Sequence, residues 1–176
     1  ERSVSSDVAG VFLFIPFLEQ LGLPKLLPGL GLPGSKPIPA LQYFLSLLAL
    51  KLAGTERLSH TDDHNFDEGL GLFAGLNVLP KCTAVSTYAY SLDRNTVDQL
   101  QAAVAAAGHR LGLYKSPTIN LDFHAVPHWG EESVLDNNWV GARGKGIKSA
   151  LTVFAQDCTS KLILYTQSDL RRSEAD

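Results

Sequence analysis

A stretch of alternating polarity, Thr118–Trp129, most constrains what this chain can fold into. Side chains in a β-strand point alternately to the two faces of the sheet, so this pattern sorts apolar residues from polar ones. The apolar set is Ile119, Leu121, Phe123 and Ala125, and the polar set is Asn120, Asp122 and His124. The stretch therefore predicts a strand that holds the carboxylate of Asp122 rigidly, a suitable position for a metal ion or for acid–base chemistry.

The segment before this strand has the pattern of a helical domain. Apolar residues at helical spacing, bounded by Gly or Pro, predict three longer helices, over 8–22, 38–54 and 96–108. Thr96 and Gln99 match a capping box at the start of the last one. The Gly- and Pro-rich residues 23–37 predict a connector whose leucines pack against the helices. We therefore expect an all-helical domain over residues 1–115.

Two further strands are expected after Thr118–Trp129, over residues 149–156 and 161–167. Between them, Asp157–Ser160 predicts a turn that the side chain of Asp157 closes. The polar residues 168–176 have the composition of the start of a helix. The fold class predicted is α+β, with an antiparallel sheet over residues 116–176.

A helix pair over residues 69–92 is a candidate helix-turn-helix for DNA binding. A short apolar helix, a turn ending at Lys81 and a second short helix follow one another. The second helix is expected to expose small hydroxyls and a tyrosine that can reach DNA phosphates or base edges: Thr83, Ser86, Thr87 and Tyr90. An ordinary pair of packed helices gives the same pattern, so both interpretations stay open.

A basic cluster lies in the long connection after the first strand. Arg143, Lys145 and Lys148 alternate with glycines, and we expect a mobile loop that suits a phosphate backbone or is merely hydrated. The spacing is not that of a P-loop. The chain has a net charge of −3, so a nucleic-acid site must be a local patch such as this one.

The polar residues 55–68 allow two interpretations. Five potential metal ligands lie close together in the sequence: His60, Asp62, Asp63, His64 and Asp67. Their spacing matches no closed zinc site, and helix caps, with Asp62 or Asp63 well placed for one, explain them as well.

The chain resembles the N-terminal part of a DDE transposase of the bacterial insertion-sequence type. The residues that carry the resemblance are Asn120–His128 (NLDFHAVPH), Trp139–Asp157 (WVGARGKGIKSALTVFAQD), Tyr165 and Asp169–Asp176, with Phe66–Lys81 in the helical region. The resemblance implies that the sheet is the first three antiparallel strands of a ribonuclease H-like core, incomplete in this chain. It also implies double-stranded DNA, the transposon ends and target, as partner, and a homodimer in the full-length enzyme.

The chemistry implied by the resemblance is DNA cleavage and strand transfer with two Mg²⁺ or Mn²⁺ ions, held by two Asp and one Glu. Asp122 matches the first of these carboxylates, and His124 and His128 would lie near the metal. The family's second Asp and its Glu belong to a later strand and helix, which this chain does not reach. We therefore expect the 176 residues to be inactive by themselves.

Two other functions remain open from the sequence. Asp122, His124 and His128 could ligate a single metal in a hydrolase, although Pro127 interrupts the alternation before His128. Alternatively, the helix pair makes the chain a non-catalytic DNA-binding regulator. We expect a cytoplasmic protein without a membrane span, in which Cys82 and Cys158 stay reduced.

Overall fold

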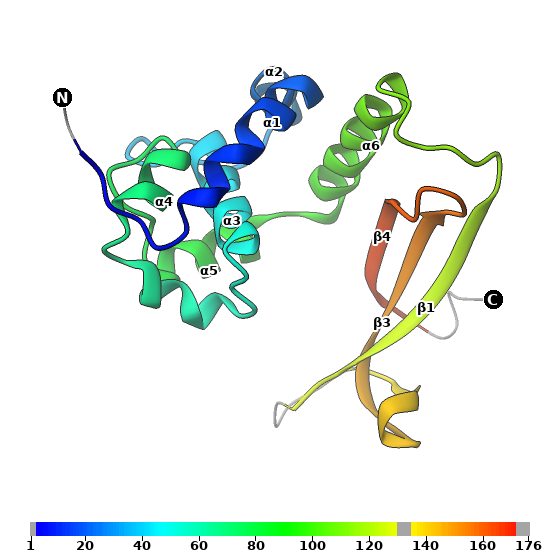
Figure 1. Cartoon of the computed structure of the whole chain (residues 1–176). Coiled ribbons are helices and arrows are strands. Elements are labelled where there is room, and N and C mark those ends of the chain that lie inside the picture. The colour runs from blue at the N-terminus through cyan, green and yellow to red at the C-terminus, as the bar shows by residue number, and fades with distance from the viewer. Residues whose placement is uncertain (1–2, 130–134, 172–176) are drawn as a thin grey trace. The chain divides into compact units, whose positions relative to one another are not determined.

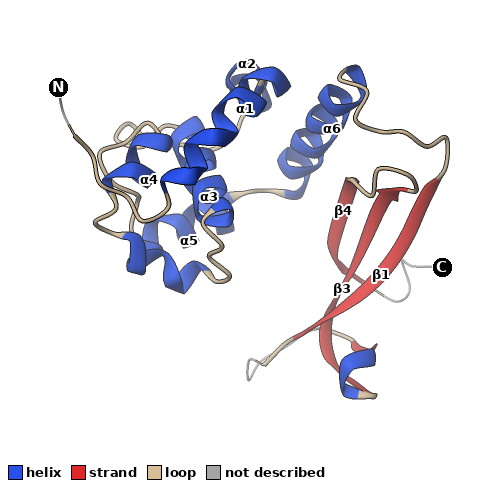
Figure 2. Ribbon diagram, in the orientation of Figure 1, coloured by secondary structure: helices blue, strands red, loops and turns tan. Residues whose placement is uncertain are grey.

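The computed structural model of this chain describes residues 3–129 and 135–171. It divides into two compact units, Glu1–Val104 and Ala105–Asp176. Helices make up the described part of the first unit, and an antiparallel sheet dominates the second (Figures 1 and 2). The α+β class is confirmed, but the boundary lies inside a helix rather than at the expected residue 115.

The first helical stretch is broken where a single helix over 8–22 was predicted. It consists of a 3₁₀ helix, η1 (Ala9–Phe14), followed by the α-helix α1 (Ile15–Leu21). Pro16 has no N–H to donate back to an earlier carbonyl, so it fits only in the first turn of a new α-helix. Gly22 ends α1 with a left-handed backbone, at φ 74°.

Two very short helices occupy the Gly- and Pro-rich connector, α2 (Leu23–Leu26) and η2 (Leu27–Leu30). Leu23, Leu27 and Leu32 are buried there and form a small core with half-buried neighbours. Among these neighbours are Leu41 of α3 (Ala40–Leu52) and Leu100 of α6 (Arg94–Arg110). The connector thus holds no long element, as predicted, and its leucines pack against the helices.

A second, larger core lies at the centre of the helical unit, around α3. Ala49 and Leu50 of α3 pack with Leu70 and Phe73 of α4 (Glu68–Phe73) and with Val11 of η1. The remaining helices of this unit are η3 (Leu58–His64) and α5 (Cys82–Ser91). Pro39 is the N-cap of α3, one position before the first turn in which it was expected.

Asp93, not Thr96, caps α6. Its carboxylate accepts hydrogen bonds from the backbone N–H of Thr96 at 2.9 Å and from the Thr96 hydroxyl at 2.7 Å. These bonds hold the pKa of Asp93 below its usual value. The helix therefore begins at Arg94, two residues before the predicted start, and runs past Gly108 to Arg110.

The sheet has β3 (Lys145–Asp157) as its central strand. β1 (Ile119–Pro127) pairs antiparallel with β3 along one edge, from Ile119 opposite Asp157 to Pro127 opposite Ser149. β4 (Ile163–Leu170) pairs antiparallel with the later half of β3, and β2 (Asn137–Val140) pairs with its first four residues. The three predicted strands are present, and β2 is an additional one.

Two of the predicted boundaries in this unit are wrong. The strand expected over 149–156 already begins at Lys145, and β2 and a 3₁₀ turn, η4 (Gly141–Arg143), lie within the long connection expected before it. The helix predicted from Ser168 does not start there, because β4 continues to Leu170. Residues 172–176 of that predicted helix lie outside the described residues.

Asp157 closes the turn between β3 and β4, as its sequence position predicted. One carboxylate oxygen accepts hydrogen bonds from the backbone N–H of Thr159 at 2.9 Å and of Ser160 at 2.6 Å. The other oxygen accepts hydrogen bonds from the backbone N–H of Lys115 at 3.0 Å and of Ser116 at 2.8 Å. A single carboxylate thus fastens the segment that enters β1 to the far end of β3.

Both faces of β1 are largely open. Leu121 is 65% exposed and Phe123 49% exposed, although their alternation matches a strand with one buried face. Within the described residues, β1 pairs only with β3, so its other edge carries unpaired backbone groups. The predicted strand is confirmed.

Within the described residues, no single helix has both the length and the apolar composition needed to cross a bilayer. The segments Ala9–Leu21 and Leu23–Leu30 meet these criteria only when taken together, and they are bent by 55° at their junction.

Candidate nucleic-acid interface

Asp122 lies in the middle of β1, opposite Phe154 of β3. Its side chain is exposed, and its polar neighbours on the same face, Asn120 and His124, lie opposite Gln156 and Thr152. The strand therefore presents the carboxylate to a ligand without burying it. The geometry predicted for Asp122 is present, with the carboxylate displayed on a strand that β3 holds in register.

The structure does not bring together the three ligands of the metal-hydrolase alternative, all of which are among the described residues. Asp122 and His124 share one face of β1 by alternation, whereas His128 lies beyond the end of this strand at Pro127. A rise of about 3.3 Å per residue separates Asp122 from His128 by roughly 20 Å. Among the described residues, no group of three His, Cys, Asp or Glu side chains is placed to hold a metal ion. Asp122 is thus a single candidate ligand, and the described residues do not complete a two-ion site around it.

The polar segment around η3 forms caps and not a metal cluster. Asp67 caps α4, accepting from the backbone N–H of Leu70 at 2.8 Å. Asp62 accepts from the backbone N–H of Cys82 at 3.1 Å and so fastens η3 to the first turn of α5. His64 lies 3.1 Å from the hydroxyl of Thr55. Hydrogen bonds of this kind engage Asp62 and Asp67, and no three His, Cys, Asp or Glu side chains of the described residues are placed to hold a metal ion. The metal interpretation of His60, Asp62, Asp63, His64 and Asp67 is therefore not supported.

The basic cluster is more ordered than a mobile loop. Arg143 lies in η4, whereas Lys145 and Lys148 are part of β3, and all three side chains are exposed. Alternation places Lys145 and Lys148 on opposite faces of the strand. The ammonium of Lys148 donates to the carbonyl of Leu135 at 2.6 Å, and the guanidinium of Arg143 lies over the ring of Trp129, with Cζ 5.5 Å from its centroid.

The helix pair departs from the helix-turn-helix pattern. The connection from α4 to α5 spans residues 74–81, whereas such motifs join their helices through three or four residues. The main partners of α5 are η3 and α3, not α4. The two helices are therefore not the compact packed pair that the motif requires.

The exposed face of α5 largely follows the prediction. Lys81, Thr83, Thr87 and Tyr90 are exposed, and Tyr90 is 91% exposed. Ser86 is the exception: it is half-buried, with its hydroxyl 3.9 Å from the sulfur of Cys82. The hydroxyl of Thr87 donates a hydrogen bond to the backbone carbonyl of Thr83 at 2.9 Å. The hydroxyl oxygen of Thr87 can still accept a hydrogen bond through its lone pairs.

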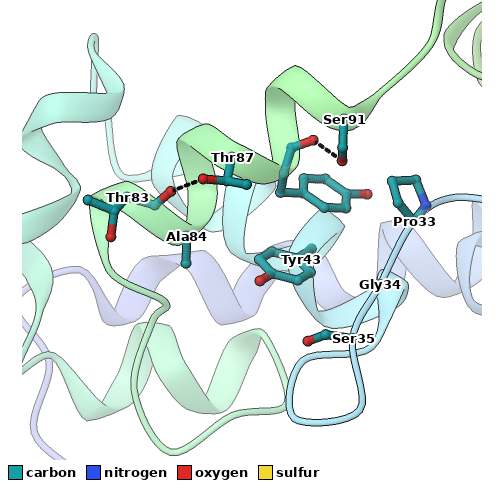
Figure 3. A pocket seen from close by; sticks show the side chains of 9 residues that line it. Pro33, Gly34, Ser35, Tyr43, Thr83, Ala84, Thr87 and Ser91 are labelled. Carbon is teal, nitrogen blue, oxygen red and sulfur yellow. Dashed lines mark hydrogen bonds between the residues drawn. The ribbon is translucent and has the colours of Figure 1, made fainter.

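A pocket of about 370 Å³ lies beside this face of α5, and its tyrosines were not predicted from the sequence (Figure 3). The rings of Tyr43 and Tyr88 stack at a centroid distance of 4.4 Å, with 8° between their planes. Burial, and then the neighbouring Tyr43, raise the pKa of Tyr88. The pocket is lined by Pro33, Gly34, Ser35, Tyr43, Thr83, Ala84, Thr87, Tyr88 and Ser91.

This lining is rich in hydroxyls, and among the described residues it includes no charged side chain. Such a surface suits a neutral polar group better than a phosphate. Sequence reasoning found Thr83 and Thr87 but missed the pocket, because α3, α5 and the loop at residues 33–35 meet only in the folded chain.

Comparison of this chain with family models, with curated proteins and with solved structures gives no match in any of the three.

Proposed function

We propose that this chain is the N-terminal portion of a DDE-type DNA transposase, with Asp122 as its first metal-binding carboxylate. The observation that carries the proposal is the position of this residue in the sheet. β1, β3 and β4 are successive antiparallel neighbours, and Asp122 is exposed in the middle of β1, at the open edge. A ribonuclease H-like core begins with such a meander, and its next strand adds beside the first.

The exposed basic residues support DNA as the partner. Arg143, Lys145 and Lys148 lie at the end of the sheet where β3 begins, on the two elements η4 and β3. Exposed Lys and Arg side chains release counterions when they neutralise DNA phosphates, so even a few contacts contribute to affinity. This local patch compensates for the net charge of −3, which would otherwise oppose binding.

The described residues alone do not complete a cleavage site. A two-ion mechanism needs several carboxylates around one site, and Asp122 is a single one. Under this proposal, the second Asp and the Glu come from outside the described residues, and this part of the protein contributes DNA binding and one ligand. A cytoplasmic location and a homodimeric enzyme belong to the same proposal.

The experiment that tests the proposal replaces Asp122 with Asn in a transposase that carries all three carboxylates. Asn keeps the size but removes the charge that a divalent cation requires, so DNA cleavage should fall by at least about a hundred-fold, as for other single electrostatic groups in active sites. Asp63→Asn, which changes an exposed carboxylate in the helical unit, is the matched control and should leave cleavage unchanged.

Retained cleavage in Asp122→Asn would remove this residue from the site. If DNA binding nevertheless persisted in the chain, the non-catalytic DNA-binding function would be the better account.

A further inference from the structure

The two tryptophans of this chain are both displayed to solvent. Trp129 is 73% exposed and Trp139 is 68% exposed. Indole rings contribute large apolar surfaces that domains ordinarily bury, so two exposed ones are informative. Neither ring was assigned a role in the DNA interface proposed above.

Both rings lie at the end of the sheet that carries the basic residues. Trp139 pairs with Gly146 at the start of β3, and Trp129 follows β1 where Pro127 lies opposite Ser149 (Figure 1). Arg143, in the turn that directly follows β2, brings its guanidinium over the Trp129 ring at 5.5 Å. This cation–π contact orients the indole and places a positive charge beside it.

The charge and the polarity around these rings indicate the chemistry of a ligand. Arg143 and Lys145 are exposed cations, and the exposed Asn137 lies two residues before Trp139 in β2. A membrane-inserting surface would surround its tryptophans with apolar side chains, and β2 does not. Exposed aromatic rings interleaved with cations match a ligand that combines phosphates with free planar rings.

We propose that Trp129, Trp139 and Arg143 form a stacking platform for unpaired DNA, and this inference rests on the DNA-binding function proposed above. In a duplex the faces of the bases are covered by their neighbours, whereas an unpaired base offers a free π-face to an indole. Arg143 and Lys145 hold the phosphates of the same strand. The ligand is a single-stranded end or an unpaired segment next to a duplex.

The platform is in line with Asp122 along the sheet. Trp139 pairs with Gly146 and Asp122 pairs with Phe154, and these two β3 positions share a face by alternation. They lie about 26 Å apart along the strand, at about 3.3 Å per residue. A DNA strand stacked on Trp139 can thus follow this face toward Asp122, on the order of eight stacked nucleotides away.

Intrinsic fluorescence tests the platform directly, because the chain has only these two tryptophans. Titration of the protein with oligothymidylate should quench tryptophan emission, and a blunt duplex of equal length should quench this emission less. Trp129→Leu and Trp139→Leu should each weaken single-strand affinity roughly ten-fold, since stacking of one base contributes about 1–3 kcal/mol. Phe66→Leu, at a ring that is 94% exposed in the helical unit, is the control and should not change affinity.

Unquenched emission, or unchanged single-strand affinity in both Trp→Leu variants, would overturn the platform. Emission that responds to anionic lipid vesicles instead of oligothymidylate would also overturn it, in favour of a membrane surface. Different results would refute the proposed function: the protein would not bind duplex DNA, and Asp122→Asn would leave DNA cleavage unchanged. Quenching by oligothymidylate alongside that result would leave the platform standing and refute the transposase.

Discussion

Asp157 is a buried carboxylate at the turn between β3 and β4. It is 2% exposed and accepts four backbone N–H hydrogen bonds, two within its own turn and two from the segment that enters β1. Burial opposes its ionisation, but hydrogen bonds from the N–H groups of Ser160, Ser116 and Thr159 outweigh burial and hold the pKa of Asp157 far below its usual value. This residue ties β1 into the sheet and so supports the position of Asp122.

This bonding predicts that Asp157→Asn destabilises the protein at neutral pH. One carboxylate oxygen is replaced by an NH₂ group that faces two backbone N–H donors, so two hydrogen bonds are lost and their donors stay buried. Urea denaturation at pH 7 should show a lower midpoint for this variant. Asp122→Asn is the matched control, because it removes an exposed carboxylate of the same sheet and should leave the midpoint unchanged.

The same variant has a predicted pH signature. A carboxylate whose folded-state pKa is lowered stabilises the protein fully above its unfolded-state pKa of about 4, and this contribution is lost as the pH falls toward the folded-state value. The difference in free energy of unfolding between the unsubstituted protein and Asp157→Asn should therefore narrow as the pH is lowered from about 5 to about 2. A difference that is independent of pH would contradict the ionised state of Asp157.

At the scale of elements, the connection between α4 and α5 is fixed by a close approach at Gly71. A Cβ added there would lie 2.6 Å from the carbonyl oxygen of Asn77 and 2.6 Å from Cα of Val78, both of them backbone atoms. The connection therefore folds directly against α4 before it enters α5. A sequence pattern of helix, turn and helix does not contain this contact, which is why the motif was predicted and its geometry was not.

This contact predicts that replacing glycine by alanine changes the free energy of unfolding in opposite directions at Gly71 and at Gly29. Alanine favours a helix by about 1 kcal/mol over glycine, but overpacking of a backbone contact costs about 1–3 kcal/mol. Gly71→Ala should thus lower the free energy of unfolding, by up to about 2 kcal/mol. At Gly29 nothing lies within 4 Å of an added Cβ, so Gly29→Ala should raise it by about 0.4–1 kcal/mol. Equal effects in denaturant titrations would contradict the close approach.

The strands were more predictable than the helices for a physical reason. Alternation is a local property, so β1, the turn at Asp157 and the β3–β4 hairpin could be read from neighbouring residues. The start of α6 at Arg94 is also set locally, but Asp93 and Thr96 are both of residue types that cap helices, and only the structure separates them. The exposure of Leu121 was not predictable, because alternation indicates two faces and not what covers them.

At the scale of the whole molecule, the chain joins a helical unit to a sheet unit through α6, which contributes residues to both. The candidate site was predictable in part: Asp122, Arg143, Lys145 and Lys148 came from the sequence. The contact of Arg143 with Trp129 and the pocket with the two tyrosines were not predicted from the sequence, because the residues that form them are distant in sequence. DNA binding by the sheet unit is the claim on which both proposals depend.

The most direct test of that claim is the salt dependence of duplex DNA binding, measured by fluorescence anisotropy. Replacing Arg143, Lys145 and Lys148 with Gln should reduce the slope of log affinity against log salt by about 2–3, since each lost phosphate contact accounts for about 0.9. The control replaces Lys25, Lys36 and Arg57, exposed residues of the helical unit, with Gln and makes the same change in net charge. The account predicts an unchanged slope for this control, and an unchanged slope in the Arg143, Lys145 and Lys148 variant would contradict it.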